Sequence, residues 1–176
     1  NRRLRHHDMS RTELVWHDGN LPSLHRPVMV LALSGLFDTA ETATKAVMHL
    51  GSTRPFLTLA EIDPDGFYDF HQERPTVWLD EEGERQLTWP TNEFRALEYP
   101  GGSHDLIVLA GVEPHVRWRT FASLVIEVAQ RTGCEVVVTV GASPETIPHT
   151  RTPSVFGSTT NEGLARALGL SRPQYQ

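Results

Sequence analysis

The stretch Pro27-Val-Met-Val-Leu-Ala-Leu-Ser34 decides the fold class that this sequence predicts. Val28 to Leu33 is a continuous apolar run, which is typical of a strand buried on both faces, as in a parallel sheet. Two later runs have the same character, Asp105 to Gly111 and Cys134 to Val140. A chain with several such strands separated by helical segments is expected to fold as an α/β domain.

The segments between these runs complete the predicted order of elements. The sequence predicts a helix from Asp38 that stops at Gly51, and a second helix over residues 114–131 that ends at Gly133. Further strands are expected over 12–18 (an edge strand), 55–63 and 92–99, a hairpin over 75–89, and a last helix over 161–169. We therefore predict a mostly parallel central sheet with flanking helices and an antiparallel hairpin insertion, in which strands 28–34, 56–62, 105–111 and 134–140 are central.

The length of 176 residues suits one domain. Residues 1–26 are interpreted as a polar N-terminal arm with a possible edge strand, and residues 27–176 as a single α/β domain. The first residue is Asn1 rather than methionine, and the last residues, 171–176, contain no closing element, so we expect a fragment of a longer protein.

Composition and motifs exclude several classes of function. The formal net charge is −6, which argues against non-specific nucleic-acid binding, and no run approaches the roughly 20 apolar residues of a membrane span. A single cysteine, Cys134, indicates a reducing compartment, and we expect a cytoplasmic protein. The usual signatures of P-loops, dinucleotide folds, serine hydrolases and zinc proteases are missing, so we expect no cofactor, no metal and no catalytic residue.

Five residues are expected near the carboxyl edge of the sheet, where open α/β folds bind ligands. They form a crevice of either structural or ligand-binding character: Asp38, Glu113, Arg117, His149 and Arg151. Asp38 is expected to cap a helix. Glu113 and Arg117 are either an ion pair that ties a loop to a helix or part of an anion site. His149 and Arg151 either hold an anion or bond to a neighbouring chain.

The helical phase of residues 114–131 makes a specific prediction for Arg117. It lies four residues before Phe121, so a helix starting at Pro114 places it within the apolar face. A buried guanidinium needs a partner. Glu113 is the expected partner, with Asp38 second. On the hairpin, Trp78 and Trp89 are expected to cover either the sheet edge or a neighbouring subunit.

At several segments the chain resembles the PAC2 family of proteasome-assembly-chaperone-like proteins, in particular its actinobacterial branch. The resemblance runs from about residue 27 to the end and is carried by LSGLFDTAETATKAVMHL (33–50), the run at 60–80, WPTNEF (89–94), LAGVEPHVRWRTF (109–121) and PHTRT (148–152). The usual PHTRP reads PHTRT here, and the family's further C-terminal region is absent.

The resemblance implies an α/β fold similar to purine nucleoside phosphorylases and peptidyl-tRNA hydrolases. It also implies a non-enzymatic protein that works through protein–protein interaction or self-assembly, with a chaperone-like role, a homo-oligomer and an unidentified protein partner. The alternative is a nucleoside-phosphorylase-like enzyme or a binder of small anions or nucleosides. That alternative would need residues from the absent C-terminal region.

Overall fold

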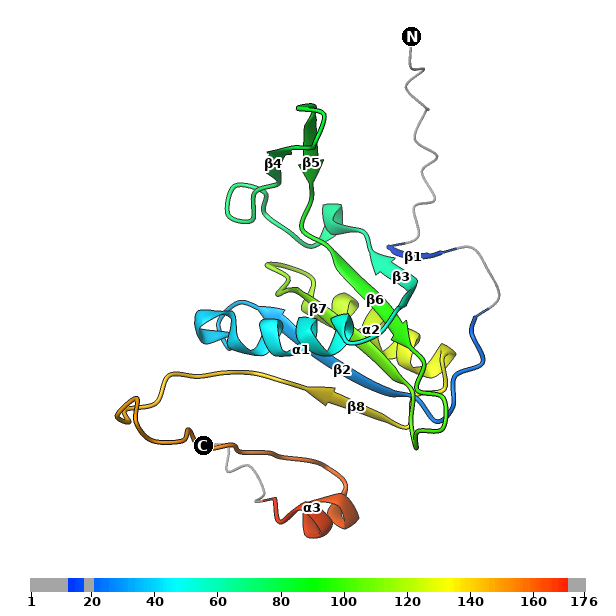
Figure 1. Cartoon of the computed structure of the whole chain (residues 1–176), viewed down its shortest axis with the longest axis vertical. Coiled ribbons are helices and arrows are strands. Elements are labelled where there is room, and N and C mark those ends of the chain that lie inside the picture. The colour runs from blue at the N-terminus through cyan, green and yellow to red at the C-terminus, as the bar shows by residue number, and fades with distance from the viewer. Residues whose placement is uncertain (1–12, 18–20, 171–176) are drawn as a thin grey trace. The chain divides into compact units, whose positions relative to one another are not determined.

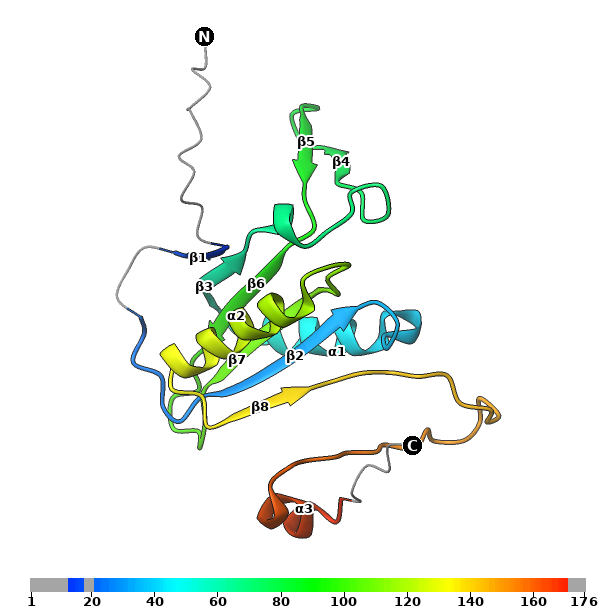
Figure 2. The ribbon, with the colours of Figure 1, turned by 180° about the vertical axis from the view of Figure 1, so that it is seen from behind.

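The computed structural model describes residues 13–17 and 21–170, so most of the predicted N-terminal arm, residues 1–12 and 18–20, lies outside the described residues. The chain forms two compact units, Asn1–Ser143 and Pro144–Gln176, which are described separately. The first unit contains a six-stranded mixed sheet with a helix on each face and a separate two-stranded sheet (Figures 1 and 2). This architecture confirms the predicted α/β class.

The elements of the first unit are mostly strands, with one α-helix after β2 and one after β7. The main sheet contains β1 (Leu14–Trp16), β2 (Val28–Ser34), β3 (Leu57–Ile62), β6 (Asn92–Leu97), β7 (Leu106–Val112) and β8 (Val136–Thr139). The separate sheet contains β4 (Thr76–Leu79) and β5 (Arg85–Thr88). The helices are α1 (Thr42–Ser52) and α2 (Trp118–Arg131), with short 3₁₀ turns η1 (Thr39–Glu41) and η2 (Pro64–Gly66).

The sheet is mixed, with the order β1-β3-β6-β7-β2-β8. β2 pairs in parallel with β7 and with β8, which accounts for the continuous apolar run that predicted it. β3, expected among parallel neighbours, pairs antiparallel with β1 and β6 instead. No α-helix connects β3 to β6, and a parallel pairing of the two would need such a crossover.

The core lies in two layers, one on each face of the sheet. Alternation along β2 directs Met29 and Leu31 towards α2, where they share a buried cluster with Phe121, Val125 and Val128. On the opposite face Ala32 packs with Ala43 and Val47 of α1. The sheet is therefore covered on both faces, as the two views show (Figures 1 and 2).

Both long helices begin differently from the prediction. α1 starts at Thr42 after the turn η1, and it continues through Gly51. Gly51 is buried, and a Cβ at this position would lie only 3.0 Å from Val108 Cγ2. Gly51 is therefore a packing position and not the end of the helix. α2 starts at Trp118, four residues after Pro114, and Arg117 precedes it in the left-handed conformation with φ 58° and ψ 36°.

β8 is the edge strand of the sheet, so the prediction of a central, buried strand at 134–140 was wrong. Its three valines, Val136, Val137 and Val138, are exposed by 39%, 43% and 40%. The reason is that α1 packs on β2 and β7, and the side chains of α2 fill the layer that contains β2, β3, β6 and β7. An apolar run in the sequence indicates that a strand can be buried, but it does not show which element covers the strand.

The second unit contains α3 (Glu162–Leu168), close to the predicted range. Asn161 caps it by accepting a hydrogen bond from the Leu164 N–H at 3.0 Å. Gly169 ends it in the left-handed conformation with φ 64°.

Candidate functional site

The candidate site is a depression at the carboxyl ends of the parallel strands β2 and β7. It has a volume of about 390 Å³ and is lined by Ser34, Gly35, Leu36, Glu73, Val112, Glu113, Pro114, His115 and Trp118. Two loops form it, residues 35–38 after β2 and 113–117 after β7. Open α/β sheets bind ligands at this edge.

Glu113 joins the two loops. Its backbone N–H donates to the Ser34 carbonyl at 2.9 Å, and its carboxylate accepts the Leu36 N–H at 2.9 Å. Gly35 lies against this side chain, since a Cβ at Gly35 would be 1.9 Å from Glu113 Oε2 and 2.7 Å from Glu113 Cβ. Glycine is required here for close approach, and the carboxylate braces the loop after β2.

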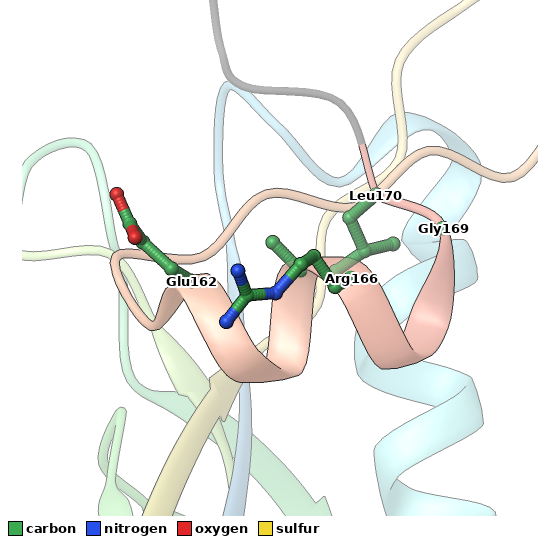
Figure 3. A pocket seen from close by; sticks show the side chains of 5 residues that line it. Glu162, Arg166, Gly169 and Leu170 are labelled. Carbon is green, nitrogen blue, oxygen red and sulfur yellow. The ribbon is translucent and has the colours of Figure 1, made fainter.

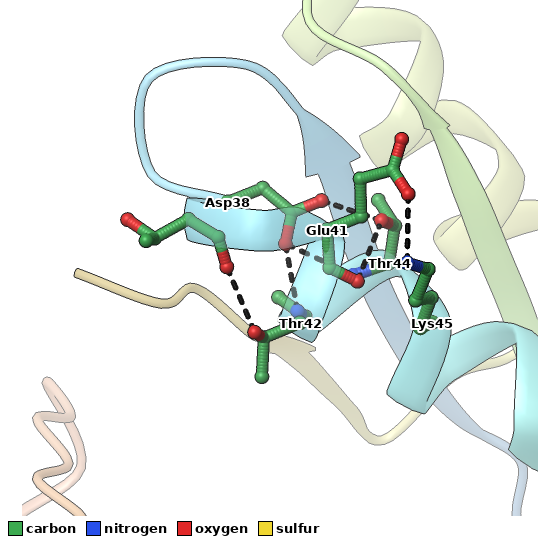
Figure 4. A network of polar contacts seen from close by, with 7 residues as sticks. Asp38, Glu41, Thr42, Thr44 and Lys45 are labelled. Atoms are coloured by element: carbon green, nitrogen blue, oxygen red, sulfur yellow. Dashed lines mark hydrogen bonds and ion pairs between the residues drawn. The ribbon is translucent and has the colours of Figure 1, made fainter. Parts of the chain in front are cut away.

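Asp38 is buried, with 6% of its surface exposed, and caps α1 (Figure 4). Its carboxylate accepts the Ala43 N–H at 2.7 Å, the Thr44 N–H at 3.3 Å and the Thr44 hydroxyl at 2.5 Å. Burial alone would raise the pKa of Asp38, but the hydrogen bonds from Thr44 and Ala43 outweigh it and hold the pKa below its usual value.

Asp38 thus accepts N–H groups of the first turn of α1, as a cap does, but it is not the N-cap residue of a capping box that the sequence predicted. Glu41, and not Asp38, occupies the position before the first helical residue, and it is left-handed with φ 56°. Its carboxylate forms an ion pair with Lys45 at 2.9 Å and does not return to the Asp38 N–H. Asp38 reaches the helix from three residues further back.

Arg117 does not pair with Glu113 or Asp38. Its Nη1 lies 2.5 Å from Glu13 Oε1, and its guanidinium carbon lies 5.2 Å from the centre of the buried Phe67 ring. The side chain is 45% exposed, so the prediction of a buried arginine was wrong. The N–H groups of His115 and Val116 both donate to the Phe67 carbonyl, which delays the start of α2 and moves Arg117 off its apolar face.

His115 was not singled out from the sequence, and it links the site to the segment after η2. Its Nδ1 accepts the Asp69 N–H at 2.9 Å, and its ring meets Tyr68 edge-on with 5.8 Å between centres. A neutral imidazole accepting through Nδ1 carries its proton on Nε2. In the sequence, His115 was marked only by its position within the segment 109–121 that carries the family resemblance.

Asn92, at the start of β6, is a second residue that the sequence did not reveal. It is fully buried, and its Oδ1 accepts the Val112 N–H at 3.0 Å. Its amide donates to the Tyr68 hydroxyl, which itself donates to the Val112 carbonyl at 2.7 Å. Burial raises the pKa of Tyr68 to about 12, with a smaller opposing contribution from Asn92. The network fixes the end of β7 beneath the depression.

His149 and Arg151 belong to the second unit, whose placement relative to the first is not described. Both are exposed, and the Arg151 N–H donates to the Pro148 carbonyl at 2.9 Å in a local turn. Their expected meeting with Glu113 and Arg117 at one edge stays a prediction.

Four exposed apolar residues surround the depression. Leu36 and Trp118 line it and are 79% and 48% exposed, and their loop neighbours Phe37 and Val116 are 67% and 52% exposed. We call these four residues the apolar rim. The Glu113 carboxylate and Arg117 are used within the fold, whereas the apolar rim has no cover among the described residues. Exposed apolar groups that gather in this way mark interaction surfaces.

The described residues meet the requirements of neither a metal site, nor a membrane span, nor a reactive thiol. Among residues 13–17 and 21–170, no group of three metal-ligating side chains could hold a metal ion, and no helix is long and apolar enough to cross a membrane. Burial raises the pKa of the Cys134 thiol, which opposes activation as a nucleophile.

The second unit has a depression of about 440 Å³ along α3 (Figure 3). Its lining residues come from the helix and its end: Glu162, Ala165, Arg166, Gly169 and Leu170. A ligand there would meet a single wall, so this depression is not a candidate site.

Comparison with known proteins decides the family. The PAC2 family model matches residues 32–176. The chain belongs to the PAC2 family. A PAC2 family protein from Streptomyces avermitilis has a similar structure, with a TM-score of 0.79 and 38% identity, covering 85% of this chain and 64% of that one. A proteasome-assembly chaperone homologue from Mycobacterium tuberculosis has a TM-score of 0.74 and 34% identity, covering 85% and 63%.

A third solved structure, a protein of unknown function from Mycobacterium tuberculosis, shares the fold. It has a TM-score of 0.79 at 24% identity, and the match covers 98% of this chain and 61% of the other. The chain thus spans less than two thirds of the length of these relatives. No protein with a curated function matches it.

Proposed function

We propose that this PAC2 protein acts without catalysis, by binding another protein through the apolar rim. The observation that carries the proposal is the difference between the polar and the apolar side chains of the depression. Glu113 and His115 are engaged in bracing the fold, while Leu36, Phe37, Val116 and Trp118 are about half to four fifths exposed. A rim of this composition gains free energy when a partner's apolar side chains cover it.

The family supports a chaperone-like role. One solved relative is described as a proteasome-assembly chaperone homologue. We extend the same role to this chain, with an unidentified protein partner and with self-association. Relatives in Streptomyces and Mycobacterium support the actinobacterial branch, and the single Cys134 supports a cytoplasmic location.

The second candidate is a nucleoside-phosphorylase-like enzyme or a binder of small anions or nucleosides. The position of the depression, at the carboxyl ends of parallel strands, favours it. Its charged lining residues oppose it, because Glu73 and Glu113 are both acidic and would repel phosphate. Arg117, the nearby cation, is held by Glu13. We therefore rank this candidate second.

A photo-crosslinking amino acid placed at Leu36 in the native cells tests the proposal. We expect crosslinks to a defined protein partner, and we expect Phe37→Ser combined with Trp118→Ser to abolish them. The same probe at Phe156, which is 84% exposed in the second unit, is the matched control. Crosslinks that survive the double substitution would refute the role of the rim.

Calorimetric titration with inosine and with inorganic phosphate tests the second candidate. Saturable binding that Glu113→Gln alters would favour it over protein binding. Absence of heat with either compound, together with rim-dependent crosslinks, would favour our proposal.

A further inference from the structure

Two carboxylates, Glu73 and Glu113, line the depression, and neither pairs with a cation among the described residues. One oxygen of Glu113, Oε2, accepts the Leu36 N–H, whereas its Oε1 has no hydrogen bond to a described residue. The Glu73 side chain has no hydrogen bond or ion pair with a described residue. The lining contains no lysine or arginine. The depression therefore combines an apolar rim with free carboxylate oxygens.

Glu73 is held at the depression through its backbone, although its side chain is free. The Asp69 carbonyl accepts the N–H groups of Gln72 and Glu73, both at 2.9 Å. The Asp69 N–H donates to Nδ1 of His115 at 2.9 Å, and His115 is itself a lining residue. The turn that carries Glu73 is thus fastened to the loop after β7, which positions its charge before any ligand arrives.

Three arginines follow or precede the lining residues in the sequence, and none of them lines the depression. Arg74 donates to a backbone carbonyl of its own turn at 3.4 Å. Arg117 is held in its ion pair with Glu13. Arg119 follows Trp118 on α2, and at 3.6 residues per turn it lies about 100° further round the helix. Each arginine is thus bonded elsewhere or turned away from Trp118.

The beginnings of α1 and α2 also contribute charge at this edge. The beginning of a helix carries about half a positive elementary charge. The hydrogen bonds from Thr44 and Ala43 hold the pKa of Asp38 below its usual value, so this carboxylate is ionised at the beginning of α1. Three full negative charges, on Asp38, Glu73 and Glu113, exceed the two partial positive ones. We therefore expect the depression to select a cation over an anion.

Trp118 adds an aromatic ring to the lining. It is 48% exposed, and none of the arginine–ring contacts among the described residues involves it. A cation placed over the face of an indole ring is attracted by the negative charge of its π-system. A free ring beside carboxylates, within an apolar rim, fits a basic side chain that has apolar neighbours.

We propose that the depression and the apolar rim bind a segment of a partner protein in which a basic residue stands between apolar residues. The cationic group of this residue lies beside Glu73, Glu113 and Trp118, and its apolar neighbours cover the rim. A free amine would leave the rim in water, so the cation is assigned to a protein segment. The inference rests on the proposed function and names the chemistry of its partner.

Titration of the 176-residue chain with short peptides, followed by nuclear magnetic resonance, tests the selection of charge. The probes are acetyl-Leu-Lys-Phe-amide and the same peptide with norleucine or glutamate in place of lysine. The indole N–H of Trp118 reports binding, and Trp118→Phe identifies its signal. We expect the lysine peptide to bind at least fivefold more tightly than the norleucine peptide, and the glutamate peptide to bind most weakly.

Substitutions of Glu73 test the same selection without disturbing the fold, because its side chain makes no bond to a described residue. Glu73→Gln should reduce the preference for the lysine peptide at least threefold. Glu73→Lys should reverse it, so that the glutamate peptide binds more tightly than the lysine peptide. Circular dichroism spectra identical to the parent establish that the variants remain folded.

The matched control lies on the hairpin of β4 and β5, which forms its own two-stranded sheet and projects beyond the beginning of β6 (Figures 1 and 2). Trp78 and Trp89 are 50% and 43% exposed, so the expectation that they cover the edge of the main sheet was wrong. Cover by a neighbouring subunit stays a prediction. Glu81 lies in the turn of this hairpin, outside the depression, and Glu81→Gln should leave the peptide preference unchanged.

The outcomes separate this inference from the proposed function. Equal binding of the three peptides, binding of none, or no reversal in Glu73→Lys would overturn the inference. Binding of n-butylamine as tight as that of the lysine peptide would overturn the assignment to a protein segment. Crosslinks at Leu36 that survive Glu73→Lys would contradict the inference and leave protein binding by the rim intact. A lysine preference without crosslinks in cells would support the chemistry of the site and refute the proposed function.

Discussion

Replacing Asn92 by alanine is expected to lower the free energy of unfolding by about 2–4 kcal/mol. Asn92 is fully buried, and its Oδ1 accepts the Val112 N–H at 3.0 Å. Leaving that N–H unpaired costs roughly 1–3 kcal/mol, and loss of the remaining amide bonds and of packed atoms adds about 1 kcal/mol. The Tyr68 hydroxyl keeps its own bond to the Val112 carbonyl, which limits the loss.

A second substitution makes this reasoning sharper. A Cβ at Gly111 would lie 1.8 Å from Asn92 Oδ1 and 2.8 Å from Asn92 Cγ. Gly111→Ala alone should therefore cost about 1–3 kcal/mol through overpacking. In the Asn92→Ala background the obstructing atoms are gone, so the double variant should unfold within about 0.5 kcal/mol of Asn92→Ala alone.

Urea denaturation followed by circular dichroism measures the free energy of unfolding of the parent, the two single variants and the double variant. The dependence of this free energy on urea concentration should be the same for all four proteins. Gly51→Ala is the control partner, because a Cβ there would meet Val108 and not Asn92. Its effect should add to that of Asn92→Ala within about 0.5 kcal/mol. Additive behaviour of Gly111→Ala with Asn92→Ala, or a loss below about 1 kcal/mol for Asn92→Ala, would refute the proposed geometry.

Two further predictions concern the caps of the helices. Asp38→Asn should destabilise the fold near neutral pH by about 0.5–1.5 kcal/mol, because an amide nitrogen cannot accept the bond that one carboxylate oxygen accepts. Because the pKa of Asp38 is lowered in the fold, its stabilisation is present above the usual value of 3.8 and disappears as the pH falls through the lowered value. Urea midpoints of parent and variant should therefore converge in acid, and a difference that persists there would contradict the role of the ionised carboxylate. Arg117→Met should cost about 1 kcal/mol or less, because its ion pair with Glu13 is partly exposed. A loss of roughly 3–5 kcal/mol in the melting curve would instead indicate a buried pair.

The parallel strands and the helices were predictable because their signals are local. Continuous apolar runs marked β2 and β7, and Asn161 and Gly169 marked both ends of α3. The surroundings of β3 and β8 were not predictable, since pairing direction depends on how distant segments connect. The apolar run at Cys134–Val140 looks the same whether a helix covers it or not.

In the candidate site, too, local features were predictable from the sequence and long-range contacts were not. Asp38 could be placed as a cap from its type and position, because capping acts within a few residues. The partner of Arg117 could not, because the start of α2 depends on the Phe67 carbonyl, about fifty positions earlier in the chain. Asn92 carried one weak signal, a polar side chain at the start of an alternating apolar strand, which became meaningful only once Gly111 lay against it.

Backbone strain lies next to both loops of the site, in η1 after the first loop and at the last residue of the second. Ala40, Glu41 and Arg117 are left-handed residues other than glycine, with φ of 56°, 56° and 58°. Each such residue costs on the order of 1 kcal/mol and persists only where its surroundings fix it. The bonds of Asp38 to α1 and the contact of Arg117 with Glu13 supply that fixation.

Fixed loops hold the apolar rim in place before any partner arrives. Glu113 accepts the Leu36 N–H, so this bond links the two halves of the rim. A preorganised surface loses less conformational entropy on association than a flexible one, and more of its apolar burial then appears as affinity. Strain that would be wasteful in a purely structural loop is consistent with a surface that binds a protein.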